Sequence, residues 1–88
     1  MRGGAAGRKM ILEAPVEVAA YVDALDGRVV FFEPRTRVVF GKIYPVGGSR
    51  RARGVDVQGD RAMITTDDGR RELWSLADHS YSYVRDID

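Results

Sequence analysis

The stretch LDGRVVFFEPRTRVVF, residues 25–40, decides the fold. It holds two runs rich in valine and phenylalanine, with turn signals at Asp26-Gly27 and at 33–36, Glu-Pro-Arg-Thr. Asp-Gly is favoured in two-residue hairpin loops because those loops need positive φ angles. Proline favours the second position of a turn because its ring holds φ near about −65°. The stretch therefore predicts three consecutive antiparallel strands.

Short apolar runs separated by turn signals continue through the rest of the chain. Gly59-Asp60 and Asp68-Gly69 indicate two further hairpins, and turn signals recur about every nine residues, which is typical of all-β domains. The predicted strands are 16–24, 28–33, 36–44, 54–58, 61–66, 70–76 and 81–85, with a short helical turn within 75–80. The predicted fold class is all-β, a small antiparallel meander forming an SH3-like barrel or a compact sandwich of five to seven strands. The likeness to SH3-like barrels is one of layout alone, without a signature motif.

The first predicted strand has an alternative. Residues 12–24 are apolar at every second position, a pattern that favours a strand. Pro15 followed by Glu17 and two alanines could also begin a helix, with proline at its first position. We predict the strand and keep the helix as the alternative.

Two-residue loops at 26–27 and 34–35 would set the register of the first three strands. Residues that pair directly across two strands share a face of the sheet. The apolar face would hold Val18, Val22, Ala24, Val29, Phe31, Val38 and Phe40. The opposite face would hold Tyr21, Asp23, Val30, Phe32, Arg37 and Val39. The first set is wholly apolar and is therefore the predicted core.

The two later hairpins differ in how well their registers are specified. A two-residue loop at 59–60 pairs Val55 with Ile64 and Val57 with Ala62, which gives a second apolar face. At Asp68-Gly69, a two-residue loop turns Trp74 outward. A three-residue loop with Gly69 left-handed turns the indole inward but places Glu72 opposite Ile64. Both registers remain open.

Length and composition predict an ordinary small globular domain. The 88 residues suggest one β domain over 10–88 after a flexible tail over 1–9. The 14 Lys and Arg against 13 Asp and Glu give a net charge of +1, which argues against a strongly basic nucleic-acid binder. The absence of cysteine excludes thiolate chemistry and favours the cytoplasm. The many arginines hint at a bacterial or phage genome, and no apolar run is long enough to predict a membrane span.

No motif carries specific chemistry. Asp78-His79-Ser80 has the residue types of a hydrolase triad, but triads assemble from distant segments. Asp67-Asp68 fits a tight turn better than a calcium loop, and residues 47–50 lack a phosphate-loop pattern. The sequence therefore predicts a protein that is not an enzyme, with no metal site and no small-molecule cofactor.

Two surface features could bind a partner. The first is the outer face of the first three strands, where we predict a protein-interaction patch of Tyr21, Val30, Phe32, Arg37 and Val39. Aromatic, aliphatic and arginine side chains together are typical of protein interfaces. The leading hypothesis is a non-catalytic module that recognises a protein surface, or a second copy of itself in a homodimer, with no membrane partner.

The second feature is the segment 34–54, which contains no acidic residue. Its candidate anion or nucleic-acid contacts are Arg35, Lys42, Arg50, Arg51 and Arg53. The alternative hypothesis is a small nucleic-acid-binding barrel that combines the Arg50–Arg53 loop with exposed aromatic rings. A loop adjoining the aromatic face would favour nucleic acid, whereas separation of the two would favour protein contact.

Overall fold

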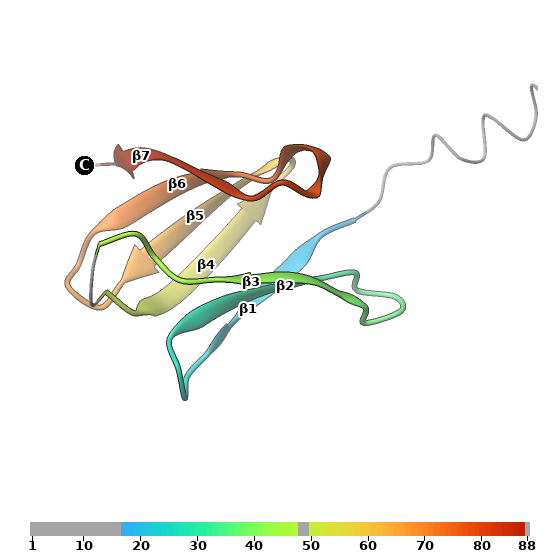
Figure 1. The fold of residues 1–88 in the computed structure, drawn as a ribbon, viewed down its shortest axis with the longest axis horizontal. Coiled ribbons are helices and arrows are strands. Elements are labelled where there is room, and N and C mark those ends of the chain that lie inside the picture. Colours follow the sequence, from blue (N-terminus) through green and yellow to red (C-terminus); the bar gives the residue numbers. More distant parts are fainter. Residues whose placement is uncertain (1–16, 48–49, 88) are drawn as a thin grey trace, which may run out of the picture.

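The structure, a computed structural model, describes residues 17–47 and 50–87, and in these residues it is all-β (Figure 1). One antiparallel sheet has the order β1-β2-β3 and the other the order β4-β5-β6-β7. The strands are β1 (Ala19–Asp23), β2 (Arg28–Phe32), β3 (Val39–Ile43), β4 (Ala52–Gln58), β5 (Arg61–Thr66), β6 (Arg71–Ser75) and β7 (Ser82–Ile87). The short helical turn predicted before the last strand is present as the 3-10 turn η1 (Ala77–His79).

The strand prediction for the first segment is confirmed over β1, and the helix alternative is wrong there. The predicted start of this strand at Val16 and the predicted tail over 1–9 lie outside the described residues. The strand pairing forms two separate sheets whose inner faces pack together, so the architecture is a small β-sandwich.

The β1–β2 hairpin keeps the predicted faces but not the predicted register. Val22 pairs with Val29 instead of Phe31, because the loop is longer than two residues. The Gly27 N–H donates to the Asp23 carbonyl oxygen at 2.8 Å, and Gly27 supplies the positive φ of this turn at +74°. A shift of two residues leaves each side chain on the same face. Ala24, a predicted core residue, lies in the turn and is exposed, so that assignment is wrong.

The predicted two-residue loop between β2 and β3 is also wrong. The Glu33 N–H donates to the Val38 carbonyl at 2.9 Å, and the Arg37 N–H donates to the Glu33 carbonyl at 2.7 Å. The Glu33 carboxylate also accepts the N–H groups of Arg35 and Thr36, which stabilises this wider turn. Val38, predicted to be core, is consequently 57% exposed.

A bulge restores the faces after this wider turn. Phe32 pairs with Val39 and Phe31 with Gly41, so Phe40 is the extra residue. Phe40 still packs against the core, as predicted. A bulge is one extra residue in one strand of a pair. Here it lets Phe31 and Phe32 stay on opposite faces although the β2–β3 turn is longer than two residues.

The four-stranded sheet confirms one prediction and resolves the other. Val57 pairs with Ala62 and Val55 with Ile64, as the Gly59-Asp60 loop requires. At the next hairpin Ala62 pairs with Trp74, so the indole points inward and Gly69 is left-handed with φ +86°. The same register buries a carboxylate, which is described below.

The core lies between the two sheets. Its centre is Phe31 on β2, whose ring stacks on Tyr81 with centroids 4.7 Å apart. The Ala52 N–H donates to the Gly27 carbonyl at 2.9 Å, which joins the two sheets at one end. The buried core cluster comprises Val29, Phe31, Ala52, Ala62, Ile64, Trp74 and Leu76.

Gly27 should tolerate a side chain much less well than Gly59. A Cβ there would lie 2.6 Å from the Arg51 Cβ, whereas a Cβ at Gly59, also left-handed, would meet no atom within 4 Å. We expect Gly59→Ala to cost about 1 kcal/mol for the backbone conformation alone. Gly27→Ala should cost roughly 1–3 kcal/mol more because of the clash. Urea unfolding measures the free energy of unfolding of both variants. Equal losses of stability would contradict the close approach of Gly27 to Arg51.

Candidate functional site

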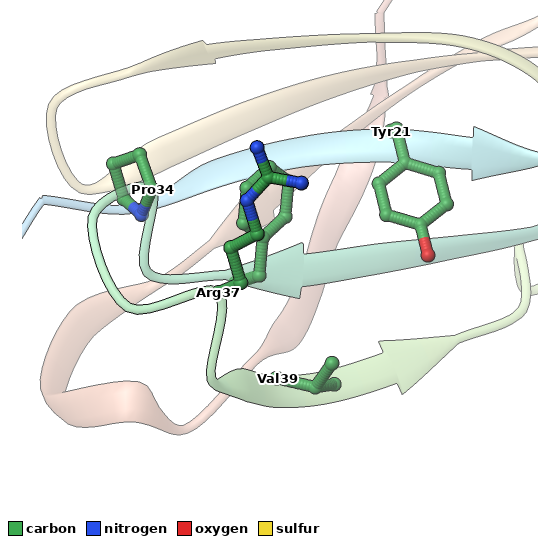
Figure 2. Close-up of a pocket in the computed structure, with 5 residues that line it drawn as sticks. Tyr21, Pro34, Arg37 and Val39 are labelled. Carbon is green, nitrogen blue, oxygen red and sulfur yellow. The ribbon is translucent and has the colours of Figure 1, made fainter.

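The outer face of the three-stranded sheet contains a hollow of about 440 Å³ (Figure 2). All three strands contribute to it: Tyr21 from β1, Phe32 from β2 and Val39 from β3. Pro34 and Arg37, from the β2–β3 turn, complete the lining. In Figure 2 the Arg37 guanidinium points from the turn towards β1.

The strand pairing explains why these side chains converge. Phe32 pairs directly with Val39, and the wider β2–β3 turn makes this pairing possible. Tyr21 lies diagonally from Phe32 across β1 and β2, and their rings meet edge to face with centroids 5.7 Å apart. Diagonal pairs on one face are within reach of aromatic side chains. The hollow therefore has an ordered aromatic wall.

The predicted interaction patch matches the lining of the hollow at four of its five positions, namely Tyr21, Phe32, Arg37 and Val39. Val30 differs because it is only 1% exposed. It lies in the middle of β2 between Tyr21 and Lys42, beneath the surface of this face and outside the core cluster. Pro34 was missed because the sequence pattern marks it only as a turn residue.

Arg37 adopts a backbone conformation that is unusual for arginine. Its φ is +65°, in the left-handed region that glycine and asparagine occupy at lower cost. Such a conformation costs about 1–2 kcal/mol for an ordinary side chain, and strain of this kind clusters at functional sites. The turn therefore holds the Arg37 side chain at the rim of the hollow in a backbone conformation that carries a cost.

The charges around the hollow are unbalanced. Within the described residues, the exposed bases Arg35, Arg37 and Lys42 form no ion pair. The Glu33 carboxylate nearby accepts the backbone N–H groups of Arg35 and Thr36, and these bonds hold its pKa below the usual value. The charge of Arg35 contributes to the same lowering of the Glu33 pKa, so the base that lines the hollow without an ion pair is Arg37.

Arg50, a predicted anion contact, is instead largely buried among carboxylates. Its side chain is 13% exposed, and Nη1 donates to Glu72 Oε2 at 2.9 Å. Nε donates to Asp68 Oδ2 at 3.1 Å, and Nη2 lies 3.5 Å from Asp86 Oδ2. In this set of residues, the Arg50–Glu72 network, each of the three guanidinium nitrogens of Arg50 has a carboxylate partner.

Glu72 is the centre of that network and is 0% exposed. Its carboxylate accepts the Trp74 Nε1–H at 3.0 Å and the Val46 N–H at 3.1 Å, in addition to the Arg50 guanidinium. A buried charge is tolerated when it is paired and hydrogen-bonded. These bonds explain how the register that turns Trp74 inward can place a carboxylate opposite Ile64.

Hydroxyl groups stabilise the two outer carboxylates of the network. The Thr66 hydroxyl donates to Asp68 and lowers the pKa of that carboxyl, with further contributions from the Arg70 N–H and from Arg50. The Tyr83 hydroxyl donates to Asp86 at 2.9 Å and lowers its pKa, assisted by Arg70 and Arg50. Both carboxylates are thus kept ionised beside Arg50.

The remaining predicted basic contacts lie apart from the hollow. The Arg51 guanidinium donates to the Leu25 carbonyl at 2.9 Å, so it packs on the β1–β2 turn. Arg53 is exposed at the bulge of β4 and has no ion pair in the described part of the chain. The hollow lies at the β2–β3 turn, and because neighbouring strands are antiparallel these two turns are at opposite ends of the sheet (Figure 1). The Arg50–Arg53 loop and the aromatic face therefore do not adjoin.

The described residues form neither a metal site nor a membrane-spanning helix. Over residues 17–47 and 50–87, no group of three or more His, Asp or Glu side chains is arranged to hold a metal ion. No helix in that part of the chain is long and apolar enough to cross a membrane. The chain matches no known family model, no curated protein and no solved structure, so the candidate site depends on its own geometry.

Proposed function

We propose that this chain is a non-catalytic module that binds a partner protein through the outer face of β1–β3. The observation that carries the proposal is the hollow lined by Tyr21, Phe32, Val39, Pro34 and Arg37. Its volume of about 440 Å³ is within the range of pockets that hold a compact ligand or large side chains. Tyrosine and phenylalanine are effective anchors because they bury much area and have few rotatable bonds.

The occupant we propose is an extended segment of another protein, with a large apolar side chain next to a carboxylate. The apolar group would fill the space beside the Tyr21 and Phe32 rings. The carboxylate would pair with Arg37, whose guanidinium has no ion pair among the described residues. Charge-assisted bonds between arginine and carboxylate add direction as well as energy.

Charge also favours a different protein over a second copy. In a two-fold dimer the same patch occurs on both sides of the interface, so an excess of one charge on the patch is doubled there. Here Arg37 lines the hollow, whereas the Glu33 carboxylate at the same turn already accepts backbone N–H groups of its own chain. A second copy would bring a second Arg37 to the hollow, and a partner with a carboxylate there would neutralise Arg37.

Selection from a phage-displayed library of random peptides tests the proposal. We expect enrichment of peptides with an aromatic or large aliphatic residue beside Asp or Glu. Tyr21→Ala should weaken a selected peptide about 30-fold, corresponding to roughly 2 kcal/mol for an aromatic anchor. Arg37→Gln should abolish the preference for acidic residues. Isothermal titration calorimetry with the selected peptide measures both effects.

Tyr44→Ala is the matched control, because Tyr44 is similarly exposed but does not line the hollow. Equal loss of affinity in Tyr44→Ala and Tyr21→Ala would overturn the assignment of the hollow, as would the absence of any enriched peptide. Analytical sedimentation tests whether a second copy of the chain occupies the hollow instead. A wild-type dimer that Tyr21→Ala converts to monomer would show that a second copy, and not an acidic partner, covers this face.

A further inference from the structure

The outer face of the four-stranded sheet carries arginines on three adjacent strands. Arg61 on β5, Arg71 on β6 and Arg85 on β7 are all exposed. Arg61 and Arg71 each precede a residue buried on the inner face, Ala62 and Glu72 respectively, so strand alternation directs them outward. Arg85 pairs with Leu73, which lies on that same outer face. We call this surface the arginine face.

Two of the three acidic strand residues of this sheet turn away from the arginine face. None of its three arginines forms an ion pair within the described residues. Glu72 and Asp86, which neighbour Arg71 and Arg85 in the chain, turn the other way and bind Arg50. The sheet thus places Glu72 and Asp86 in the Arg50–Glu72 network and leaves the three arginines facing solvent.

One acidic strand residue shares the arginine face, and it is already bonded. Asp56 pairs with Met63 on this side of the sheet, and its carboxylate accepts the Gln58 Nε2–H at 3.0 Å. Asp56 lies diagonally from Arg61, because Asp56 pairs with Met63 and Gln58 pairs with Arg61. The strands β5 and β6 separate it from Arg85. It therefore offsets part of the charge near Arg61 and leaves the positive charge of Arg71 and Arg85 in place.

The spacing of the arginines indicates what kind of anion they could meet together. Arg61 pairs with Ser75, and Arg71 lies four residues from Ser75 along β6. At about 3.3 Å per residue the two arginines are therefore about 13 Å apart along the strand direction. Side chains that stand perpendicular to the sheet at this separation fit an extended polyanion better than a single carboxylate or phosphate.

We propose that the arginine face binds the phosphate backbone of double-stranded nucleic acid. A duplex carries one negative charge per about 1.7 Å of its axis, so charges are available wherever three separated arginines reach. Between the arginines the face presents Met63, Thr65 and Leu73, without an aromatic ring. Proteins that prefer single strands stack bases on aromatic side chains, and this face offers none. It lies on the opposite side of the sandwich from the hollow, so both surfaces can be occupied at once.

The test is fluorescence anisotropy with a labelled DNA duplex of arbitrary sequence, measured between low and moderate salt. Three phosphate contacts predict a slope of about −2.7 in log K against log salt, or roughly 40-fold weaker binding at 200 mM than at 50 mM. The variant Arg61→Gln, Arg71→Gln, Arg85→Gln should lose nearly all of this salt-dependent binding. A labelled single strand should bind no more tightly than the duplex.

The matched control removes three bases around the hollow: Arg35→Gln, Arg37→Gln, Lys42→Gln. Both triple variants change the net charge from +1 by −3 to −2, so total charge is equal. The control should retain duplex binding and lose the peptide binding proposed above, which separates failure of one proposal from failure of the other. Equal loss in both variants, tighter single-strand binding, or displacement of the duplex by polyglutamate at equal charge concentration would each overturn the proposal.

Discussion

Arg50→Leu should lower the free energy of unfolding by about 3–5 kcal/mol, because it leaves a buried carboxylate without its cation. Glu72 is fully buried, and after the substitution its remaining donors are the Trp74 indole and the Val46 N–H. A domain of this size has a total stability of about 4–13 kcal/mol. The loss is therefore a large part of the total, and urea unfolding followed by tryptophan fluorescence would measure it.

A double-mutant cycle identifies the cause of that loss. If the unpaired charge is responsible, adding Glu72→Leu to Arg50→Leu should restore most of the stability. Arg70→Leu is the control, since Arg70 also pairs with Asp86 but is far more exposed, and its removal should cost less than about 1 kcal/mol. If Arg50→Leu itself lost less than about 1 kcal/mol of stability, solvent and not Arg50 would be what stabilises the negative charge of Glu72.

Phe31→Ala should be about as costly, with a loss of roughly 3–5 kcal/mol. Phe31 is fully buried between the sheets and stacks on Tyr81, so its removal leaves a cavity. Phe32→Ala, one residue further on the opposite face of β2, should cost clearly less because its ring is only partly buried. Urea unfolding of the two variants thus measures which face of β2 is the core, and a larger loss in Phe32→Ala would contradict the sandwich.

Much of the fold could be predicted from local sequence because the signals were local. Gly59-Asp60 set the register of β4 and β5 correctly, since one tight turn aligns the whole hairpin. At the β1–β2 hairpin the register was wrong by two residues, yet Val22 and Val29 still share the core face. An even shift preserves alternation, so the faces were more predictable than the pairs.

The β2–β3 turn shows where local signals were insufficient. Pro34 indicates a turn, but the turn length depends on how Glu33 bonds to the N–H groups that follow it. That choice moved Val38 into solvent and paired Val39 with Phe32. The hollow exists only as a result of this arrangement, although four of its five lining side chains could be assigned to one face from alternation.

The sequence by itself determined the strands, the alternation of their faces and the aromatic composition of the outer surface, because each of these depends on neighbours in the chain. The partners of the charged residues were decided only by the tertiary structure. Arg50 looked like a solvent-facing base, and it binds Glu72, 22 residues away, because packing of the two sheets brings the β3–β4 connection onto β6. The β5–β6 register turned Trp74 inward, and the described residues supply no ion pair to Arg37, Arg61, Arg71 or Arg85. Electrostatic partners are set by distance in space, and strand pairing by itself does not specify which sheets will meet.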